Sequence, residues 1–208
     1  MRLPFVAGAI TAFLLGSFFF VLSFSSLYAD EEVHYDQIAR FARGDLSLNP
    51  ALTTLPGYHA LLGLIGYVTG VTNIPFMRFL SSLIGLATIG VFGLISRELY
   101  RDAGFLRVLQ FAFLPILFPF FFLLYTDVLS LLFILLAFLF ILRERSTLAA
   151  MMSLAGVLVR QTNIVWLLFF FAFLIHAFMA FPLIGALWRR MYGVHGSSSS
   201  EEYVSSFS

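Results

Sequence analysis

Apolar residues fill long stretches of this chain, and short polar passages separate one stretch from the next. A helix needs about 20 consecutive apolar residues to cross a bilayer. We interpret six stretches as membrane spans, of which the fourth and fifth are short: 3–27, 75–96, 105–124, 128–142, 147–159 and 164–187. The pattern predicts an all-α polytopic membrane protein with about six transmembrane helices. The first is expected to be a retained anchor, because it shows no clear cleavage site.

The longest polar passage ahead of the C-terminal tail runs from Tyr28 to His59. Apolar residues at helical spacing predict that its first part is a helix along the membrane surface: Tyr35, Ile38, Phe41 and Ala42. The apolar segment 58–71 that follows is too short to cross a bilayer. We expect it to form an interfacial or re-entrant helix whose glycines pack against other helices or permit bends. Residues 28–74 thus form one loop with interfacial helices between the first and second spans.

Composition supports a membrane protein and excludes other classes. Hydrophobic residues make up 61% of the chain and charged residues 11%, with a mean hydropathy of +0.97. A net charge of +1 gives no reason to expect a nucleic-acid partner. Because the chain has no cysteine, disulfides and thiolate metal sites are excluded.

The arginines indicate which ends of the spans face the cytoplasm. All twelve basic residues are arginines, and arginine-rich loops tend to stay on the cytoplasmic side. If 58–71 does not cross, eight of the twelve lie on that side: Arg2, Arg97, Arg101, Arg107, Arg143, Arg145, Arg189 and Arg190. This topology places 28–74, 125–127 and 160–163 together on the opposite face.

The three polar clusters on that opposite face contain the candidates for chemistry. Five of the eleven acids fall between positions 30 and 45, where the alternative is a solvated face that orients a surface helix. Asp127 and Arg160 lie at span ends, and ionisable groups at membrane depth are functional candidates because their burial is costly. The alternative there is a structural ion pair. No zinc motif, glycine-rich phosphate loop or nucleophile elbow occurs, and no metal site is expected.

Four motifs, in this order, resemble the Alg10 family of endoplasmic-reticulum glucosyltransferases: YADEEVHYDQ, LTTLPGYH, YTDVLS and RQTNIVW. The second motif departs from the family pattern, since Leu55 stands where a proline is expected. The motifs contain the residues that we take as candidates for the site: Asp30, Glu31, His34, Gln37, Thr53, Thr54, Tyr125, Asp127, Arg160, Gln161 and Asn163.

The resemblance implies a GT-C-like fold and a reaction in the endoplasmic reticulum membrane, with the active face in the lumen. Glucose would pass from dolichyl-phosphate glucose to a diglucosylated dolichol-linked oligosaccharide, forming the α-1,2 bond that completes the N-glycan precursor. The lipid-linked donor is then a co-substrate, and no other cofactor is expected. The implied partners are membrane lipid and the dolichol-linked oligosaccharide; protein partners are left open.

The implied chemistry assigns roles to the candidates. An inverting transfer needs a carboxylate that takes the proton of the acceptor hydroxyl, and donors that stabilise the departing phosphate. Asp30 is the expected base, with the adjacent Glu31 as its competitor. Arg160 is expected to bind the lipid phosphate, because its geometry matches phosphate oxygens, with further donors from His34 and Gln161. Asp127 would orient a sugar hydroxyl or Arg160, and the remaining candidates would contact substrate.

Two segments follow from this interpretation: a membrane module over 1–192, and a disordered Ser-rich tail over 193–208. Members of the family are expected to be longer, so the chain is interpreted as a truncated form. An inactive or regulatory homologue is therefore the main alternative function. A small channel or transporter ranks last, since the spans carry almost no polar residues.

Overall fold

The computed structural model describes residue 16, residues 26–100, residues 104–173 and residue 175. The expected first span and the Ser-rich tail lie outside the described residues, apart from Gly16. The described part of the chain is helical without strands, which agrees with the predicted all-α class. The chain divides after Leu168 into two compact units, and the site discussed below lies in the first. The described residues of the second unit, which starts at Phe169, are helical.

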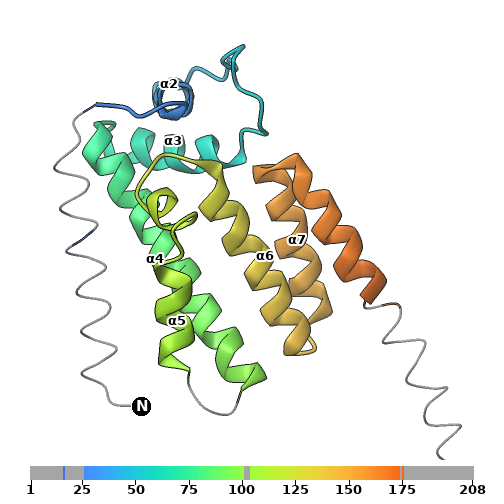
Figure 1. The fold of residues 1–208 in the computed structure, drawn as a ribbon. Coiled ribbons are helices and arrows are strands. Elements are labelled where there is room, and N and C mark those ends of the chain that lie inside the picture. The colour runs from blue at the N-terminus through green and yellow to red at the C-terminus, as the bar shows by residue number, and fades with distance from the viewer. Residues whose placement is uncertain (1–15, 17–25, 101–103, 174, 176–208) are drawn as a thin grey trace, which may run out of the picture. The chain divides into compact units, whose positions relative to one another are not determined.

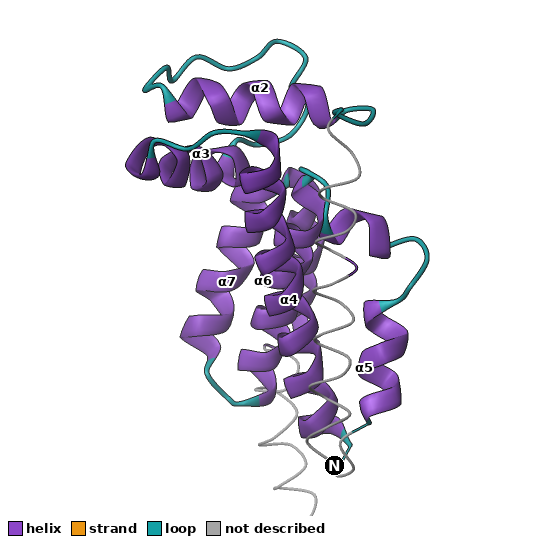
Figure 2. Cartoon of the chain, turned by 90° about the vertical axis from the view of Figure 1, so that its left-hand side faces the viewer, coloured by secondary structure: helices purple, strands orange, loops and turns teal. Residues whose placement is uncertain are grey.

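Three helices form the body of the first unit: α4 (Ile74–Leu99), α6 (Thr126–Leu142) and α7 (Ser146–Val159). Helix α6 packs against both α4 and α7. Two further helices, α2 (Glu31–Ala42) and α3 (Gly57–Thr69), pack on each other and lie across one end of this body, as Figures 1 and 2 show from two sides. The turn between α6 and α7 lies at the opposite end.

Helix α2 confirms the prediction of an amphipathic helix in the polar passage. Its Ile38 is completely buried and belongs to a core cluster that also includes Tyr58 and Leu62 of α3 and Met77 of α4. The helix ends where Gly44 adopts a left-handed backbone with φ of +79°, a conformation that glycine tolerates at no steric cost. The apolar face of α2 therefore packs into the core of the fold.

Helix α3 has 13 residues, so the predicted short helix is also confirmed. Its glycines allow neighbouring elements to approach closely. A Cβ atom on Gly57 would lie 2.5 Å from the carbonyl oxygen of Leu158 at the end of α7, and one on Gly63 would lie 2.5 Å from the Cβ of Phe41 in α2. The absence of side chains at these glycines thus lets α3 pack closely against α2 and the end of α7.

The prediction that 105–124 forms one continuous helical span is wrong, because the helix is interrupted. The structure has the short α5 (Phe105–Ala112), a turn, and the 3₁₀ helix η1 (Phe118–Phe121). Pro115 and Pro119 explain the break, because proline lacks a backbone N–H and clashes with the preceding turn of a helix. The chain after η1 is buried, with Phe122 and Leu124 fully enclosed.

Among the described helices, α4 alone is long and apolar enough to cross a membrane by length and composition. Helices α6 and α7 have 17 and 14 residues, in line with the short spans expected there. The number of spans, and the interpretation of 164–187 as the last of them, stay predictions.

Candidate functional site

Asp30 lies at the surface immediately before α2. Its backbone carbonyl accepts hydrogen bonds from the N–H groups of Val33 and His34, which begins the helix. Its carboxylate makes no capping bond to the helix and is exposed. The side chain is therefore placed by a rigid helix start while its oxygens stay accessible to a ligand.

Glu31 follows directly but points into the protein, where its carboxylate is completely buried. Oε1 accepts hydrogen bonds from Arg78 Nε at 2.9 Å and from the backbone N–H of Leu124 at 3.0 Å. Oε2 accepts from Arg78 Nη2 at 2.5 Å and from the backbone N–H of Tyr28 at 3.0 Å. A carboxylate offers about four acceptor positions, so these four bonds use the acceptor capacity of Glu31.

Arg78, near the start of α4, is the partner that the sequence analysis did not single out. Its side chain is 1% exposed, and besides Glu31 it donates to the carbonyl oxygen of Ser26 at 2.9 Å. It thus fixes the chain on both sides of Asp30. A charged residue inside an apolar helix is itself a signal of a buried pair or a functional site, and that signal was present in the run 75–96.

Asp127 and Arg160 form an ion pair between Arg160 Nη1 and Asp127 Oδ1. Asp127 lies in the first turn of α6 and Arg160 directly follows α7, so the pair joins the ends of two adjacent helices. Both side chains are more than one-third exposed, at 38% and 36%. The sequence placed these two residues at span ends on one face, and the structure brings them together. The pair is accessible to a ligand, unlike the ion pair of Glu31 and Arg78.

His34 connects the two groups of charges. It lies one turn into α2, is 8% exposed, and its pKa is lowered by burial. The carboxylates of Asp30 and Asp127 oppose this shift, and the Arg160 guanidinium adds to it. All three charges are therefore near enough to influence the same imidazole.

Aromatic rings complete the surroundings of His34. The ring of Tyr125 meets it edge-on with centroids 5.3 Å apart, and the Tyr125 hydroxyl donates to the carbonyl oxygen of Tyr28 at 3.4 Å. The ring of His59 in α3 stacks on that of His34, with centroids 5.1 Å apart. His59 was not among the expected site residues, and only the folded chain brings it to His34.

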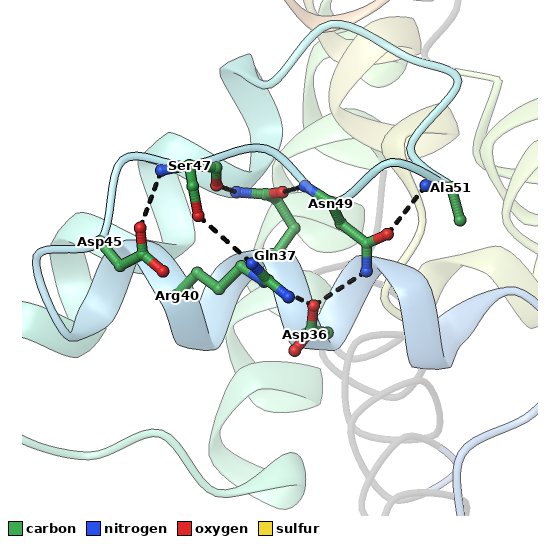
Figure 3. A network of polar contacts seen from close by, with 7 residues as sticks. All are labelled: Asp36, Gln37, Arg40, Asp45, Ser47, Asn49 and Ala51. Carbon is green, nitrogen blue, oxygen red and sulfur yellow. Dashed lines mark hydrogen bonds and ion pairs between the residues drawn. The ribbon is translucent and has the colours of Figure 1, made fainter.

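Gln37 and Asn163 support the structure around the site. Gln37 is fully buried, donates from Nε2 to the carbonyl oxygen of Ser47 at 3.0 Å and accepts from the N–H of Asn49 at 2.6 Å, which fixes the loop after α2 (Figure 3). Asn163 is buried and donates to Ser130 Oγ at 2.7 Å and to the carbonyl oxygen of Gly156 at 2.8 Å. In the described part of the chain, neither side-chain amide is hydrogen-bonded to Asp30, Asp127 or Arg160.

The remaining candidates lie where the loop before α3 meets the end of α7. Gln161 Nε2 donates to the carbonyl oxygen of Thr53 at 2.9 Å. Thr53 and Gln161 are both exposed, whereas the Thr54 hydroxyl is buried with no hydrogen-bond partner among the described residues. The loop is thus tied to Gln161, the immediate neighbour of Arg160.

Metal-ligating side chains do not gather in this cluster. Within the described ranges, no group of three or more His, Cys, Asp or Glu residues has the arrangement that could hold a metal ion. The expectation that no metal takes part stays a prediction.

The residues of this cluster lie within a region that matches a known protein family. The model of the DIE2/ALG10 family matches residues 24–181, which include Asp30, His34, Asp127 and Arg160. The chain belongs to the DIE2/ALG10 family. The resemblance drawn from the four motifs is therefore confirmed, and it covers the whole of the cluster described above.

Several curated members of the DIE2/ALG10 family match the chain. They are named Dol-P-Glc:Glc(2)Man(9)GlcNAc(2)-PP-Dol alpha-1,2-glucosyltransferase. The protein of Rattus norvegicus is 32% identical over 68% of this chain and 34% of its own length. The protein of Kluyveromyces lactis is 34% identical over 67% of this chain and 28% of its own length. The one in Arabidopsis thaliana is 31% identical over 68% and 32%. The matched region thus spans about a third of the length of these relatives. No solved structure matches the chain.

Proposed function

We propose that this chain carries the acid-base site of a membrane glucosyltransferase of the endoplasmic reticulum. The donor would be dolichyl-phosphate glucose, and the acceptor a diglucosylated dolichol-linked oligosaccharide. One observation carries the proposal: the exposed Asp30 begins the helix that carries His34, and the Tyr125 ring that contacts His34 lies two residues before Asp127, the partner of Arg160. The names of the family relatives supply the donor and the acceptor.

Asp30 is the base in this proposal. As the acceptor hydroxyl oxygen forms its bond to the anomeric carbon of glucose, its proton passes to the Asp30 carboxylate. The bond from the anomeric carbon to the phosphate oxygen breaks, and dolichyl phosphate leaves with the electron pair. Attack from the face opposite the phosphate inverts the anomeric centre. Glu31 is a poor competitor, because its oxygens already accept four hydrogen bonds inside the protein.

Arg160 is the proposed phosphate ligand. A guanidinium has five N–H donors in a planar fork that matches phosphate oxygens. The pair with Asp127 involves Nη1, so Asp127 orients the guanidinium while other donors can bind phosphate. The neighbouring Gln161, also exposed, would extend this donor surface.

The membrane arrangement belongs to the same proposal. Large apolar side chains are exposed along the helices of the body, among them Phe79, Leu83, Leu154 and Leu158, and such a surface is suited to lipid. With six spans, α2 and α3 would lie at the lumenal membrane surface, next to the phosphate of a lipid-linked sugar. No protein partner is part of this proposal.

Transfer from a labelled donor tests the proposal. The chain, purified and reconstituted in liposomes, would be given dolichyl-phosphate [³H]glucose and the diglucosylated lipid-linked acceptor. We expect labelled acceptor that loses its label to a glucosidase specific for α-1,2 bonds, and far less labelled product with Asp30→Asn. Donor binding without any transfer would instead favour the inactive or regulatory homologue.

A further inference from the structure

Two buried histidines from different helices share a hydrogen bond beside the proposed base. Nδ1 of His34 in α2 and Nε2 of His59 in α3 are 2.8 Å apart, and the two rings stack at an interplanar angle of 23°. His59 is completely buried and His34 is 8% exposed. Burial lowers the pKa of both rings, that of His59 to about 3. Both are therefore neutral near pH 7, and one proton lies between the two nitrogens.

The two other ring nitrogens have different surroundings. Nδ1 of His59 is buried with no hydrogen-bond partner among the described residues. Nε2 of His34 has no protein partner there either, but it is not among the fully buried unpartnered atoms, so it is the solvent-accessible nitrogen of the pair. Among the hydrogen bonds of the described residues, only the one to His59 therefore bears on the tautomer of His34.

Two tautomeric arrangements are possible. If His34 donates to His59, then His59 carries a buried, unpaired N–H on Nδ1, and His34 directs the lone pair of Nε2 outward. If His59 donates to His34, then His34 directs an N–H outward. Orphaned buried N–H groups are rare in proteins. The carboxylates of Asp30 and Asp127, each with a larger effect on His34 than the opposing Arg160 guanidinium, favour an N–H over a lone pair. Both considerations select the second arrangement.

We propose that His59 is a positioning residue that donates its Nε2–H to Nδ1 of His34 and thereby presents His34 as a neutral Nε2–H donor at the site. That donor would bind an oxygen of the donor lipid's phosphate, next to Arg160. This role for His34 rests on the proposed function, whereas the direction of the bond between the histidines does not. His59 itself touches no substrate.

The tautomer can be measured without any activity. In the full chain labelled with ¹⁵N-histidine in detergent micelles, two-bond nitrogen–proton couplings report which nitrogen of each ring carries hydrogen. Single His34→Gln and His59→Gln variants assign the two signals. We expect His34 protonated on Nε2 and unprotonated on Nδ1 at pH 7. His34 protonated on Nδ1 would overturn the proposal.

Two substitutions at position 59 separate positioning from packing. Phenylalanine keeps a stacked ring but cannot donate, whereas the amide nitrogen of glutamine takes the place of Nε2. We expect His59→Phe to lower turnover about 10- to 100-fold, by analogy with the loss of partners that orient metal-bound histidines, while His59→Gln stays within about 3-fold of the wild type. Both variants should unfold near the wild-type temperature.

The outcomes distinguish this inference from the proposed function. If the wild type transfers no glucose, the proposed function fails, and the histidine spectrum alone decides the direction of the bond. If the wild type is active and His59→Phe is equally active, the positioning role is wrong while the proposed function stands. A loss of turnover in both His59→Phe and His59→Gln, with both folded, would also contradict donation by residue 59.

Discussion

Glu31 and Arg78 form a two-point ion pair in which the arginine side chain is 1% exposed and the glutamate is not exposed at all. The pair ties the start of α2 to α4, and through the N–H of Leu124 it also ties both to the chain just before α6. Asp30 immediately precedes Glu31, and Asp127 follows Leu124 by three residues. The inaccessible ion pair thus holds together the two chain segments that carry the accessible acids.

Breaking this pair should act on folding. Glu31→Gln leaves the Arg78 guanidinium buried without its counter-charge, which typically costs about 3–5 kcal/mol. We expect a lower free energy of unfolding, measured by denaturant titration in detergent. Adding Arg78→Met to Glu31→Gln should cost less than the sum of the single changes, since the unpaired charge is then removed. A Glu31→Gln protein of normal stability that has lost turnover would instead identify Glu31 as the base.

Removing the proton acceptor should act on turnover. Asp30→Asn keeps the size of the side chain but cannot take a proton at neutral pH, so we expect transfer to fall by about 10² to 10⁴-fold with little change in stability. Glu32→Gln is the matched control, because Glu32 is an exposed acid in the first turn of the same helix. Equal transfer by Asp30→Asn and the wild type would rule out this base.

The close approach of α2 and α3 should make one glycine sensitive and another tolerant. In Gly63→Ala the new Cβ would lie 2.5 Å from the Cβ of Phe41, and such overpacking typically costs about 1–3 kcal/mol. Gly90→Ala in α4 meets nothing within 4 Å, and alanine within a helix is favoured over glycine by roughly 0.5–1 kcal/mol. Thermal unfolding should place the two variants on opposite sides of the wild type.

The buried histidines should make stability depend on pH in a defined window. The unfolded-state pKa of His59 is 6.5 and the folded-state pKa is about 3, so below pH 6.5 the unfolded chain binds a proton that the folded chain excludes. Stability should therefore be fully present above pH 6.5 and fall as the pH drops towards 3. His59→Phe should flatten this decline, most clearly between pH 6.5 and 4. An unchanged slope would mean that His59 is protonated in the fold.

Labelling of single cysteines tests the topology. The natural chain has no cysteine, so Ser47→Cys and Ser146→Cys each provide one reactive thiol. Both serines are exposed, Ser47 in the loop after α2 and Ser146 at the start of α7, at opposite ends of the helical body. In sealed microsomes we expect a membrane-impermeant reagent to label Ser146→Cys and to reach Ser47→Cys only after permeabilisation. Labelling of both from one side would exclude the six-span arrangement.

Local pattern was sufficient for several features of this protein. The spacing of apolar residues predicted α2, the shortness of 58–71 predicted α3, and the motifs identified the family. These features depend on neighbours in sequence, through helical periodicity and the length of apolar runs. Pro115 and Pro119 also indicate the helix break within 105–124. The high apolar content of this segment instead favoured the prediction of a continuous span.

The different surroundings of adjacent residues came only from the tertiary structure. Asp30 and Glu31 are adjacent acids with nearly the same local sequence. Successive helical residues point about 100° apart, and here Asp30 faces solvent whereas Glu31 faces Arg78. Likewise Gln37, which was predicted to contact substrate, is buried and fixes a loop, and His59 contacts His34 from 25 residues away in sequence. Which carboxylate is buried depends on where α4 presents Arg78, and that position is set by the packing of helices far apart in the chain.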